Sequence, residues 1–283
     1  MDSMLCRITL ALLCAATLSA KDFHVYYLGG QSNMDGFGYV KELPTEINEP
    51  VDGVWIFHGN MAPDGVAVDG RWIWAQLRPG HGTGFESDGK TNAYSDRFGV
   101  ELTFARRMKE LHPDRNIALI KYSRGGTSID ERAARFFGSW EADYIDGDGE
   151  VDRLIPAGIL WMQGESDAGT AKVARRYERN LKRLMDLIRA ALRSDDLPIA
   201  IGRISDSGND EIDGKVWNYG GIVRQAQQDF VDSDVAAVIV TSTDGYGYSD
   251  PYHYDSPGYI DFGRKFAEAL ARTECSLALA MRF

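Results

Sequence analysis

Apolar residues in this chain gather in short runs that are separated by segments with helical spacing. Most of the runs are apolar throughout, which is typical of strands that are covered on both faces. They predict strands at 23–28, 54–58, 116–122, 157–162, 199–204 and 235–241. The segments between them predict helices at 97–111, 171–193, 217–232 and 257–272. Strands that alternate with helices indicate a parallel sheet with helices on both of its faces.

The longest of these predicted helices, at 171–193, is amphipathic. Its apolar residues follow the spacing of three and four that makes one buried stripe: Ala174, Tyr177, Leu181, Leu184, Ile188 and Ala191. Basic residues occupy much of the rest: Arg175, Arg176, Arg179, Lys182, Arg183 and Arg189. We interpret this basic face as a solvated helix surface rather than a ligand patch. Thr170 is the expected N-cap, and Pro198 prevents the helix from continuing into the next strand.

The region 59–96 interrupts the alternation of strands and helices. It holds seven Gly, two Trp and two Pro, and we interpret it as a long structured insertion. Trp72 and Trp74 either stack on a sugar or pack the insertion onto the body of the protein. His81, in the same region, is expected to face solvent. Without a linker or an internal repeat, residues 21–283 are predicted to form a single domain.

Residues 1–20 have the composition of a secretory signal peptide. Arg7 precedes an apolar run, Ile8 to Ala16, and small residues follow up to Ser19 and Ala20. We expect cleavage after Ala20, with Ala16 as an alternative, and a secreted or periplasmic protein. Cleavage removes Cys6 and Cys14, which leaves Cys275 alone, so neither an intramolecular disulfide nor a cysteine metal site is expected.

The chain is acidic, with 42 Asp and Glu against 31 Lys and Arg and a formal net charge of −11. Such a charge disfavours nucleic acid and anionic membrane surfaces as partners. A neutral or weakly charged substrate is expected, and the oligomeric state is left open.

Candidate catalytic residues lie near the two ends of the chain. Ser32 follows the apolar run 23–28 and two glycines, at the position where open α/β sheets carry their chemistry. Asp250 and His253 are three residues apart in a turn-rich segment. A serine with an Asp–His pair supplies a nucleophile, its base and the group that orients the base. Ser32 could instead be a helix N-cap, a common role for serine.

A second serine competes with Ser32 as the nucleophile. Ser166 follows the predicted strand 157–162, and its Gly164-x-Ser166-x-Ala168 context is closer to a nucleophile elbow. Composition and spacing do not choose between the two serines.

Four blocks in order resemble the SGNH-hydrolase superfamily: Gly30-Gln31-Ser32-Asn33-Met34, Gly125-Gly126-Thr127-Ser128-Ile129, Trp161-Met162-Gln163-Gly164-Glu165-Ser166-Asp167 and Asp250-Pro251-Tyr252-His253. More narrowly, they are similar to its sialate O-acetylesterases and family six acetylxylan esterases. The resemblance covers residues 23 to about 270. It implies a three-layer α/β/α sandwich of flavodoxin-like type around a central parallel sheet.

The resemblance also implies the roles of the site residues. Ser32 would be the nucleophile, His253 the general base, and Asp250 the group that orients His253. The backbone N–H groups of Ser32 and Gly125 and the side-chain amide of Gln163 would form the oxyanion hole. Gly126 is the alternative donor to Gly125. Many superfamily members carry Asn where this chain has Gln163, and the glutamine is typical of this branch.

Glu165 lies in the same block as Gln163 and could orient His253 in place of Asp250, or assist it. We favour Asp250, because a separation of three residues in a turn brings its carboxylate near the imidazole. Glu165 is then expected to anchor the loops around the nucleophile through hydrogen bonds to backbone.

No metal or organic cofactor is expected. The acidic cluster of Asp143, Asp146, Asp148, Glu150 and Asp152 lacks the glycine and the closing glutamate of an EF-hand loop, and we interpret it as a solvated turn. The leading hypothesis is a secreted serine esterase that removes O-acetyl groups from an acetylated polysaccharide or sialic acid. The alternatives are a lipase or thioesterase of the same superfamily and an inactive glycan-binding protein.

Overall fold

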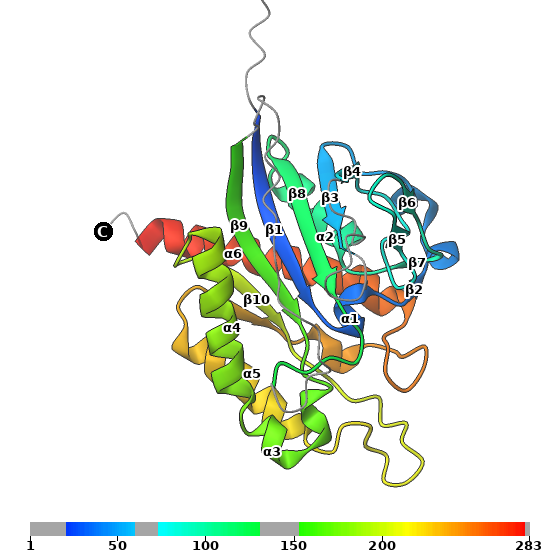
Figure 1. Ribbon diagram of the computed structural model, residues 1–283, viewed down its shortest axis with the longest axis vertical. Helices are drawn as coiled ribbons and strands as arrows, with labels where there is room; N and C mark the ends of the chain where they lie inside the picture. Colours follow the sequence, from blue (N-terminus) through cyan, green and yellow to red (C-terminus); the bar gives the residue numbers. More distant parts are fainter. Residues whose placement is uncertain (1–20, 60–72, 131–152, 281–283) are drawn as a thin grey trace, which may run out of the picture.

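A seven-stranded sheet forms the centre of the computed structural model, which describes residues 21–59, 73–130 and 153–280. The strand order is β11-β10-β9-β1-β8-β3-β4 (Figure 1). The strands are β1 (Asp22–Gly30), β3 (Val54–His58), β4 (Ala75–Gln76), β8 (Asn116–Ser123), β9 (Arg153–Met162), β10 (Ile199–Gly202) and β11 (Ala237–Val240). All neighbours pair in parallel except β3 and β4. The predicted parallel sheet is confirmed, with one short antiparallel strand at its edge.

Helices cover both faces of this sheet, as the apolar strands require. Helices α2 (Glu101–Leu111) and α6 (Ser256–Ala280) pack together behind it in Figure 1, and α4 (Tyr177–Leu192) and α5 (Gly220–Ser233) lie together in front. The close approach of α6 shows at Gly202, where a Cβ atom would lie 2.5 Å from the ring of Phe262. The three-layer α/β/α class is therefore confirmed.

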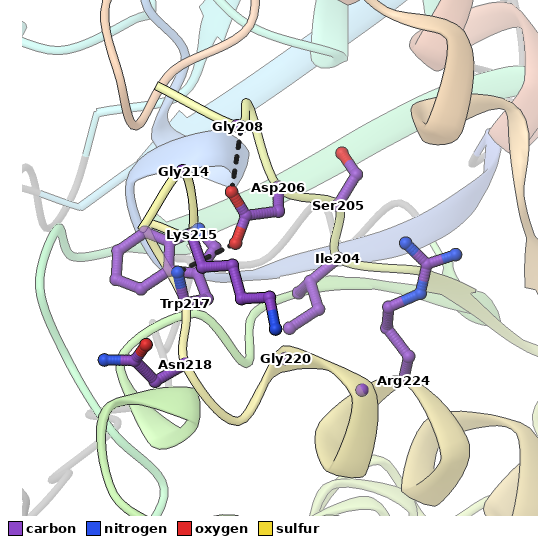
Figure 2. Close-up of a pocket in the computed structure, with 11 residues that line it drawn as sticks. Ile204, Ser205, Asp206, Gly208, Gly214, Lys215, Trp217, Asn218, Gly220 and Arg224 are labelled. Atoms are coloured by element: carbon purple, nitrogen blue, oxygen red, sulfur yellow. Dashed lines mark hydrogen bonds between the residues drawn. The ribbon is translucent and has the colours of Figure 1, made fainter. Parts of the chain in front are cut away.

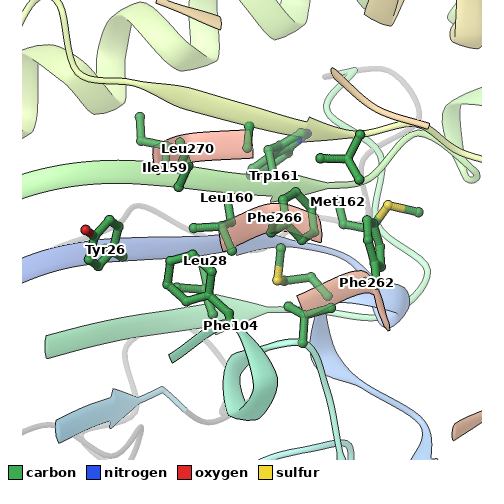
Figure 3. Packing of buried hydrophobic residues seen from close by; sticks show 14 of the residues in the cluster. Tyr26, Leu28, Phe104, Ile159, Leu160, Trp161, Met162, Phe262, Phe266 and Leu270 are labelled. Carbon is green, nitrogen blue, oxygen red and sulfur yellow. The ribbon is translucent and has the colours of Figure 1, made fainter. Parts of the chain in front are cut away.

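The core lies between the sheet and these helices. On the α6 side, the ring of Tyr26 of β1 packs against that of Phe104 with centroids 5.1 Å apart. Leu28 of β1 and Phe262 and Phe266 of α6 belong to the same fully buried cluster (Figure 3). The rings of Phe262 and Phe266 stack with centroids 4.4 Å apart. Each fully buried apolar side chain contributes about 1.5–3 kcal/mol relative to its exposed state. Burial of these side chains thus holds α6 and α2 against the central strand.

The helix predicted at 171–193 is wrong as one continuous element. The structure divides it into α3 (Ala171–Ala174) and α4, and Thr170 makes no side-chain cap bond. The break coincides with Arg176, whose Nε and Nη2 atoms lie 2.5 and 2.8 Å from the carboxylate of Asp130. Since Asp130 is buried, this bidentate pair fixes the guanidinium where a continuous basic face would have pointed it to water.

Arg189 also differs from the predicted solvated face. It is buried, donates to the Leu197 carbonyl and pairs with Asp234 at 2.5 Å. Charge periodicity identified the face correctly for the exposed Lys182 but not for Arg189. The reason is that the carboxylate lies 45 positions further along the chain.

The remaining helix and strand bounds shift by a few residues. Residues 97 and 98, expected in a helix, form β7 (Arg97–Phe98), which pairs with β2 (Gly38–Tyr39). Helix α5 begins at Gly220 rather than 217, and α6 extends eight residues past the expected end at 272, to Ala280. In the ranges that the structure covers, no helix is long and apolar enough to cross a membrane.

The insertion is ordered around short pairings in its described part, 73–96. Strand β5 (Glu86–Ser87) pairs with β6 (Asn92–Ala93), and Trp74 packs its ring against Phe57 of β3 at 5.8 Å. His81 is fully buried, so the expectation that it faces solvent is wrong. The predicted signal peptide, Trp72 and the acidic cluster 143–152 lie outside the described residues.

Candidate active site

Ser32 lies at the carboxyl end of the central strand, as the first residue of the short helix α1 (Ser32–Asp35). Gly30 makes this turn possible, because its φ is +150° and a Cβ atom there would lie 2.0 Å from the carbonyl oxygen of Met162. The N-cap position belongs to Gln31, which makes no side-chain capping bond, and Ser32 is the first residue inside the helix. The N-cap interpretation of Ser32 therefore does not describe this turn.

Asp250 and His253 form a hydrogen-bonded pair in the loop before α6. The Asp250 Oδ2 atom lies 2.8 Å from His253 Nδ1, and its Oδ1 atom accepts from the backbone N–H groups of Tyr252 and His253. Partial burial raises the pKa of Asp250, but the bonds from His253 and Tyr252 outweigh it and hold the pKa below its usual value. An ionised Asp250 keeps the proton on Nδ1 and leaves Nε2 free to accept one.

The imidazole of His253 is held on its other side by a ring. Phe37 stacks on it with centroids 3.6 Å apart and an interplanar angle of 3°. Together with Asp250, this contact restricts both the tilt and the rotation of the imidazole.

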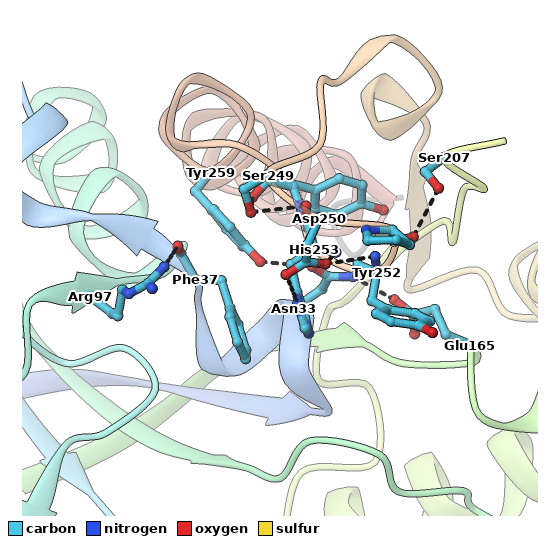
Figure 4. A network of polar contacts seen from close by, with 12 residues as sticks. Asn33, Phe37, Arg97, Glu165, Ser207, Ser249, Asp250, Tyr252, His253 and Tyr259 are labelled. Carbon is cyan, nitrogen blue, oxygen red and sulfur yellow. Dashed lines mark hydrogen bonds and ion pairs between the residues drawn. The ribbon is translucent and has the colours of Figure 1, made fainter. Parts of the chain in front are cut away.

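Asn33 joins the turn that carries Ser32 to the loop that carries Asp250 and His253, here called the histidine loop (Figure 4). Its Nδ2 atom donates to the carbonyl of Tyr252 at 3.2 Å, and its Oδ1 atom accepts from the N–H of Tyr254 at 3.4 Å and from the hydroxyl of Tyr259 at 2.7 Å. These bonds attach the residue after Ser32 to the backbone on both sides of His253. The structure thus brings together two segments that lie some 220 positions apart.

Gly125 follows the adjacent strand β8 and faces Ser32. A Cβ atom built on Gly125 would lie 3.5 Å from the Cβ of Ser32, so the glycine backbone borders the serine directly. Gly126 has a φ of +70°, a left-handed conformation that favours glycine. The Arg124 N–H donates to the Gly30 carbonyl and fixes the two strand ends against each other.

Gln163, at the end of β9 on the other side of β1, is buried in a polar network. Its Nε2 atom lies 2.6 Å from Asp167 Oδ2 and 3.0 Å from the carbonyl of Thr127. Burial raises the pKa of Asp167. A primary amide has two N–H donors, so an oxyanion would have to replace one of these acceptors. Gln163 therefore lies near the predicted site residues, but its amide N–H groups are bonded to Asp167 and to the Thr127 carbonyl.

Glu165 contacts Asn33 rather than His253. Its Oε1 atom accepts from Asn33 Nδ2 at 2.9 Å, and its Oε2 atom has no hydrogen-bond partner in the described part of the chain. Burial raises the pKa of Glu165 to about 6. The Glu165 carboxylate holds the turn that carries Ser32 through the side chain of Asn33, whereas the sequence predicts bonds to backbone.

Ser166 follows Glu165 and donates its backbone N–H to Gln31 Oε1 at 3.3 Å. Asn33, the neighbour of Ser32, makes hydrogen bonds to the backbone of the histidine loop at Tyr252 and Tyr254. Ser32 stays the predicted nucleophile, with Ser166 as the alternative.

A buried ionic cluster behind α1 was missed by the sequence analysis. Lys121 Nζ, fully buried, lies 2.7 Å from each of three acceptors: Glu101 Oε2 and the carbonyls of Asp35 and His81. Burial raises the pKa of Asp35 to about 6 and lowers that of His81 to about 3. The cluster fixes the last residue of the helix that Ser32 begins. Its signal was a lysine inside the apolar run 116–122.

Within the described ranges, no group of three or more His, Cys, Asp or Glu side chains is placed to hold a metal ion.

A serine turn held against an Asp–His loop, at the carboxyl edge of a parallel sheet, is the arrangement of an SGNH-type carboxylic ester hydrolase. The family described as "Carbohydrate esterase, sialic acid-specific acetylesterase" matches residues 22–272. The chain belongs to this family, and it is a carbohydrate esterase.

Individual relatives share this fold at low sequence identity. A probable carbohydrate esterase of Arabidopsis thaliana is 24% identical over 293 residues, covering 89% of this chain and 91% of the relative. The solved structure of that protein has a TM-score of 0.62 and covers 90% of this chain and 99% of that one. The structure of NanS, 14% identical, has a TM-score of 0.57 with 92% of this chain and 99% of that chain covered.

Proposed function

We propose that this chain is a secreted serine esterase that removes O-acetyl groups from a carbohydrate through an acyl-enzyme intermediate. In the first step the Ser32 hydroxyl attacks the acetyl carbonyl carbon while His253 Nε2 takes its proton. The resulting oxyanion accepts hydrogen bonds from the N–H groups of Ser32 and Gly125. Gln163 Nε2 adds a third bond when the oxyanion replaces one of its present acceptors, Asp167 or the Thr127 carbonyl. The bond between the acetyl carbon and the sugar oxygen then breaks while His253 protonates that oxygen, so that the sugar leaves as an alcohol and the acetyl group stays on Ser32.

In the second step a water molecule replaces the sugar. His253 takes a proton from this water as it attacks the acetyl carbonyl, and acetate leaves when the Ser32 oxygen recovers the proton. Asp250 stays ionised throughout and stabilises the imidazolium that forms in each step. No group beyond the chain's own residues and water enters these steps.

The observation that carries the proposal is the bridge from Asn33 to both sides of His253. It holds the histidine loop against the serine turn, and such positioning supplies much of the rate enhancement of enzymes. The family to which the chain belongs supports the acetyl group as the acyl part.

Secretion is supported by where the first strand begins. Strand β1 starts at Asp22, two residues after the proposed cleavage site at Ala20, so removal of residues 1–20 would leave the sheet intact. N-terminal sequencing of the exported protein tests this, and retention of Met1 in that protein would contradict it.

Ser32→Ala tests the nucleophile. It should abolish release of 4-nitrophenol from 4-nitrophenyl acetate while the circular dichroism spectrum stays that of the wild type. Ser166→Ala is the matched control and should keep most of the activity. Loss of activity in Ser166→Ala alone would assign the nucleophile to the other serine.

Two comparisons test the substrate. Octanoate esters should be poorer substrates than acetate esters, and a preference for octanoate would favour a lipase or thioesterase. Acetate release from acetylated xylan and from O-acetylated sialic acid then identifies the carbohydrate. Glycan binding without turnover, unchanged in Ser32→Ala, would indicate a binding protein instead.

A further inference from the structure

A groove of about 490 Å³ lies at the carboxyl end of β10, between the loop 203–219 and the start of α5 (Figure 2). Its volume falls within the roughly 300–1,000 Å³ of small-molecule sites. Trp217 and Lys215 border it on the loop side, and Gly221 and Arg224 on the helix side. None of these residues takes part in the proposed chemistry.

The groove shares a wall with the histidine loop. The ring of Trp217 packs against that of Tyr252 with centroids 5.7 Å apart, and Tyr252, which is half exposed, directly precedes His253. The hydroxyl of Ser207 donates to the carbonyl of Pro251 at 2.9 Å. A ligand in the groove would therefore lie beside the substrate whose ester reacts at Ser32.

The charges in the groove are largely compensated. The Asp206 carboxylate accepts from the backbone N–H groups of Gly208, Val216 and Trp217, and Arg224 pairs with Asp244 at 2.9 Å. An ionic ligand that bonded to Asp206 or Arg224 would have to displace these partners, and Lys215 is the third charged residue of the lining. The lining of the groove therefore suits an uncharged ligand, in agreement with the net negative charge of the chain.

The other polar and aromatic side chains that line the groove are complementary to a sugar. The side chains of Lys215 and Asn218 are exposed and make no hydrogen bond or ion pair with other described residues, so both can bond to hydroxyl groups. The indole of Trp217 offers a large, rigid apolar face. A pyranose ring presents an apolar C–H face and a rim of hydroxyls, which are complementary to these two kinds of surface.

We propose that this groove binds a neutral sugar unit that neighbours the acetylated one. The substrate is then an acetylated oligosaccharide or polysaccharide with a neutral backbone rather than a single sugar. This inference rests on the proposed function, because it assigns a second binding position to the substrate of that reaction.

The chain length of the substrate tests the proposal. KM and kcat are measured for acetylated mono- to tetrasaccharides of xylose, glucose and mannose backbones. For at least one backbone, KM should fall about tenfold from the monosaccharide to the longer chains while kcat changes little, since the added unit contributes binding remote from the reacting bond.

Gly221→Phe should fill the groove without disturbing the fold. A Cβ atom on Gly221 meets no other atom within 4 Å, and its φ is not in the left-handed region. In this variant KM for the longer chains should rise to the monosaccharide value, with 4-nitrophenyl acetate hydrolysis unchanged. Gly221→Ala is the control for the backbone change and should keep the dependence on chain length.

Trp217→Ala should raise KM for the longer chains about tenfold. Trp55→Ala removes a partly exposed tryptophan of β3 that does not line the groove, and it should leave KM unchanged. Chain-length independence for all three backbones, or a dependence that survives Gly221→Phe, would overturn the proposal. Failure of the proposed function looks different: no carbohydrate releases acetate, or Ser32→Ala stays active.

Discussion

Asn33 holds the main chain on both sides of His253, so the residue next to the proposed nucleophile also positions the proposed base. One amide side chain makes these bonds and a further one to Glu165. The Ser32 hydroxyl and the imidazole are therefore not positioned independently. A change at Asn33 moves one relative to the other.

Asn33→Ala should lower kcat about a hundredfold, because a displacement of about 1 Å between reacting groups can cost this much. It should also lower the free energy of unfolding by about 1–3 kcal/mol, since buried partners such as Tyr259 lose a bond. Kinetics on 4-nitrophenyl acetate and urea unfolding measure the two effects. Asn180→Ala, which removes a bond to Asp130 away from the site, is the control. A kcat within twofold of the wild type would show that Asn33 does not align the site.

Asp250→Asn should reduce kcat by a factor on the order of 10⁴ with little loss of stability. The amide keeps the shape of the turn but holds the imidazole in the wrong tautomer and no longer compensates the imidazolium. Asp88→Asn is the matched control, because Asp88 also accepts backbone N–H groups in an exposed turn, away from any histidine. Equal activities of the two variants would indicate that Glu165 or another group orients His253.

Glu165→Gln should change how stability depends on pH. Burial raises the pKa of the Glu165 carboxyl from 4.5 to about 6 in the folded protein, so the folded state favours the protonated form. The stability contribution of this group is complete below pH 4.5 and is lost as pH rises through about 6. Relative to the wild type, the variant should gain roughly 2 kcal/mol of unfolding free energy between these limits.

Urea unfolding at intervals from pH 4 to pH 7 measures this difference, and contributions from other groups cancel in the comparison. Glu178→Gln, at an exposed position of α4, should give a difference that does not change with pH. A constant difference for Glu165→Gln as well would place its folded pKa at the ordinary value.

Lys121→Met should lower the free energy of unfolding by about 3–5 kcal/mol. The substitution leaves the fully buried Glu101 carboxylate without its cation. Lys121→Met combined with Glu101→Gln should recover part of this loss, because no unpaired charge remains. Lys182→Met removes an exposed pair with Asp186 and should cost less than about 1 kcal/mol. Equal losses for the two lysines would show that the Lys121 site is hydrated.

The fold was largely predictable because its signals are local. A strand covered on both faces must be apolar throughout, so β1, β3, β8 and β9 stood out as runs. Ser32, Gly125 and Gln163 follow three of these strand ends, and the ends of parallel strands meet at one edge of a sheet. The order of the four blocks therefore carried Ser32, Gly125 and Gln163 to the same place.

What the sequence did not reveal depends on contacts between distant residues. Arg176 and Arg189 looked like solvated charges, because their carboxylate partners lie 46 and 45 positions away. His81 is buried by the packing of Phe85 and His58 around it, which follows from how the insertion folds onto the sheet. The bridging role of Asn33 was equally invisible, since it requires two segments to be already adjacent.

The pairing of the three central strands determines when esterase activity appears during folding. Strand β1 pairs with β9 from Asp22 to Gly30 and with β8 from Phe23 to Gly30. Ser32, Gly125 and Gln163 follow the ends of these three strands. None of the three is near another along the chain. During refolding, esterase activity would thus return only after the three central strands have paired up to their carboxyl ends. The return of ester hydrolysis would therefore report on a late step of folding.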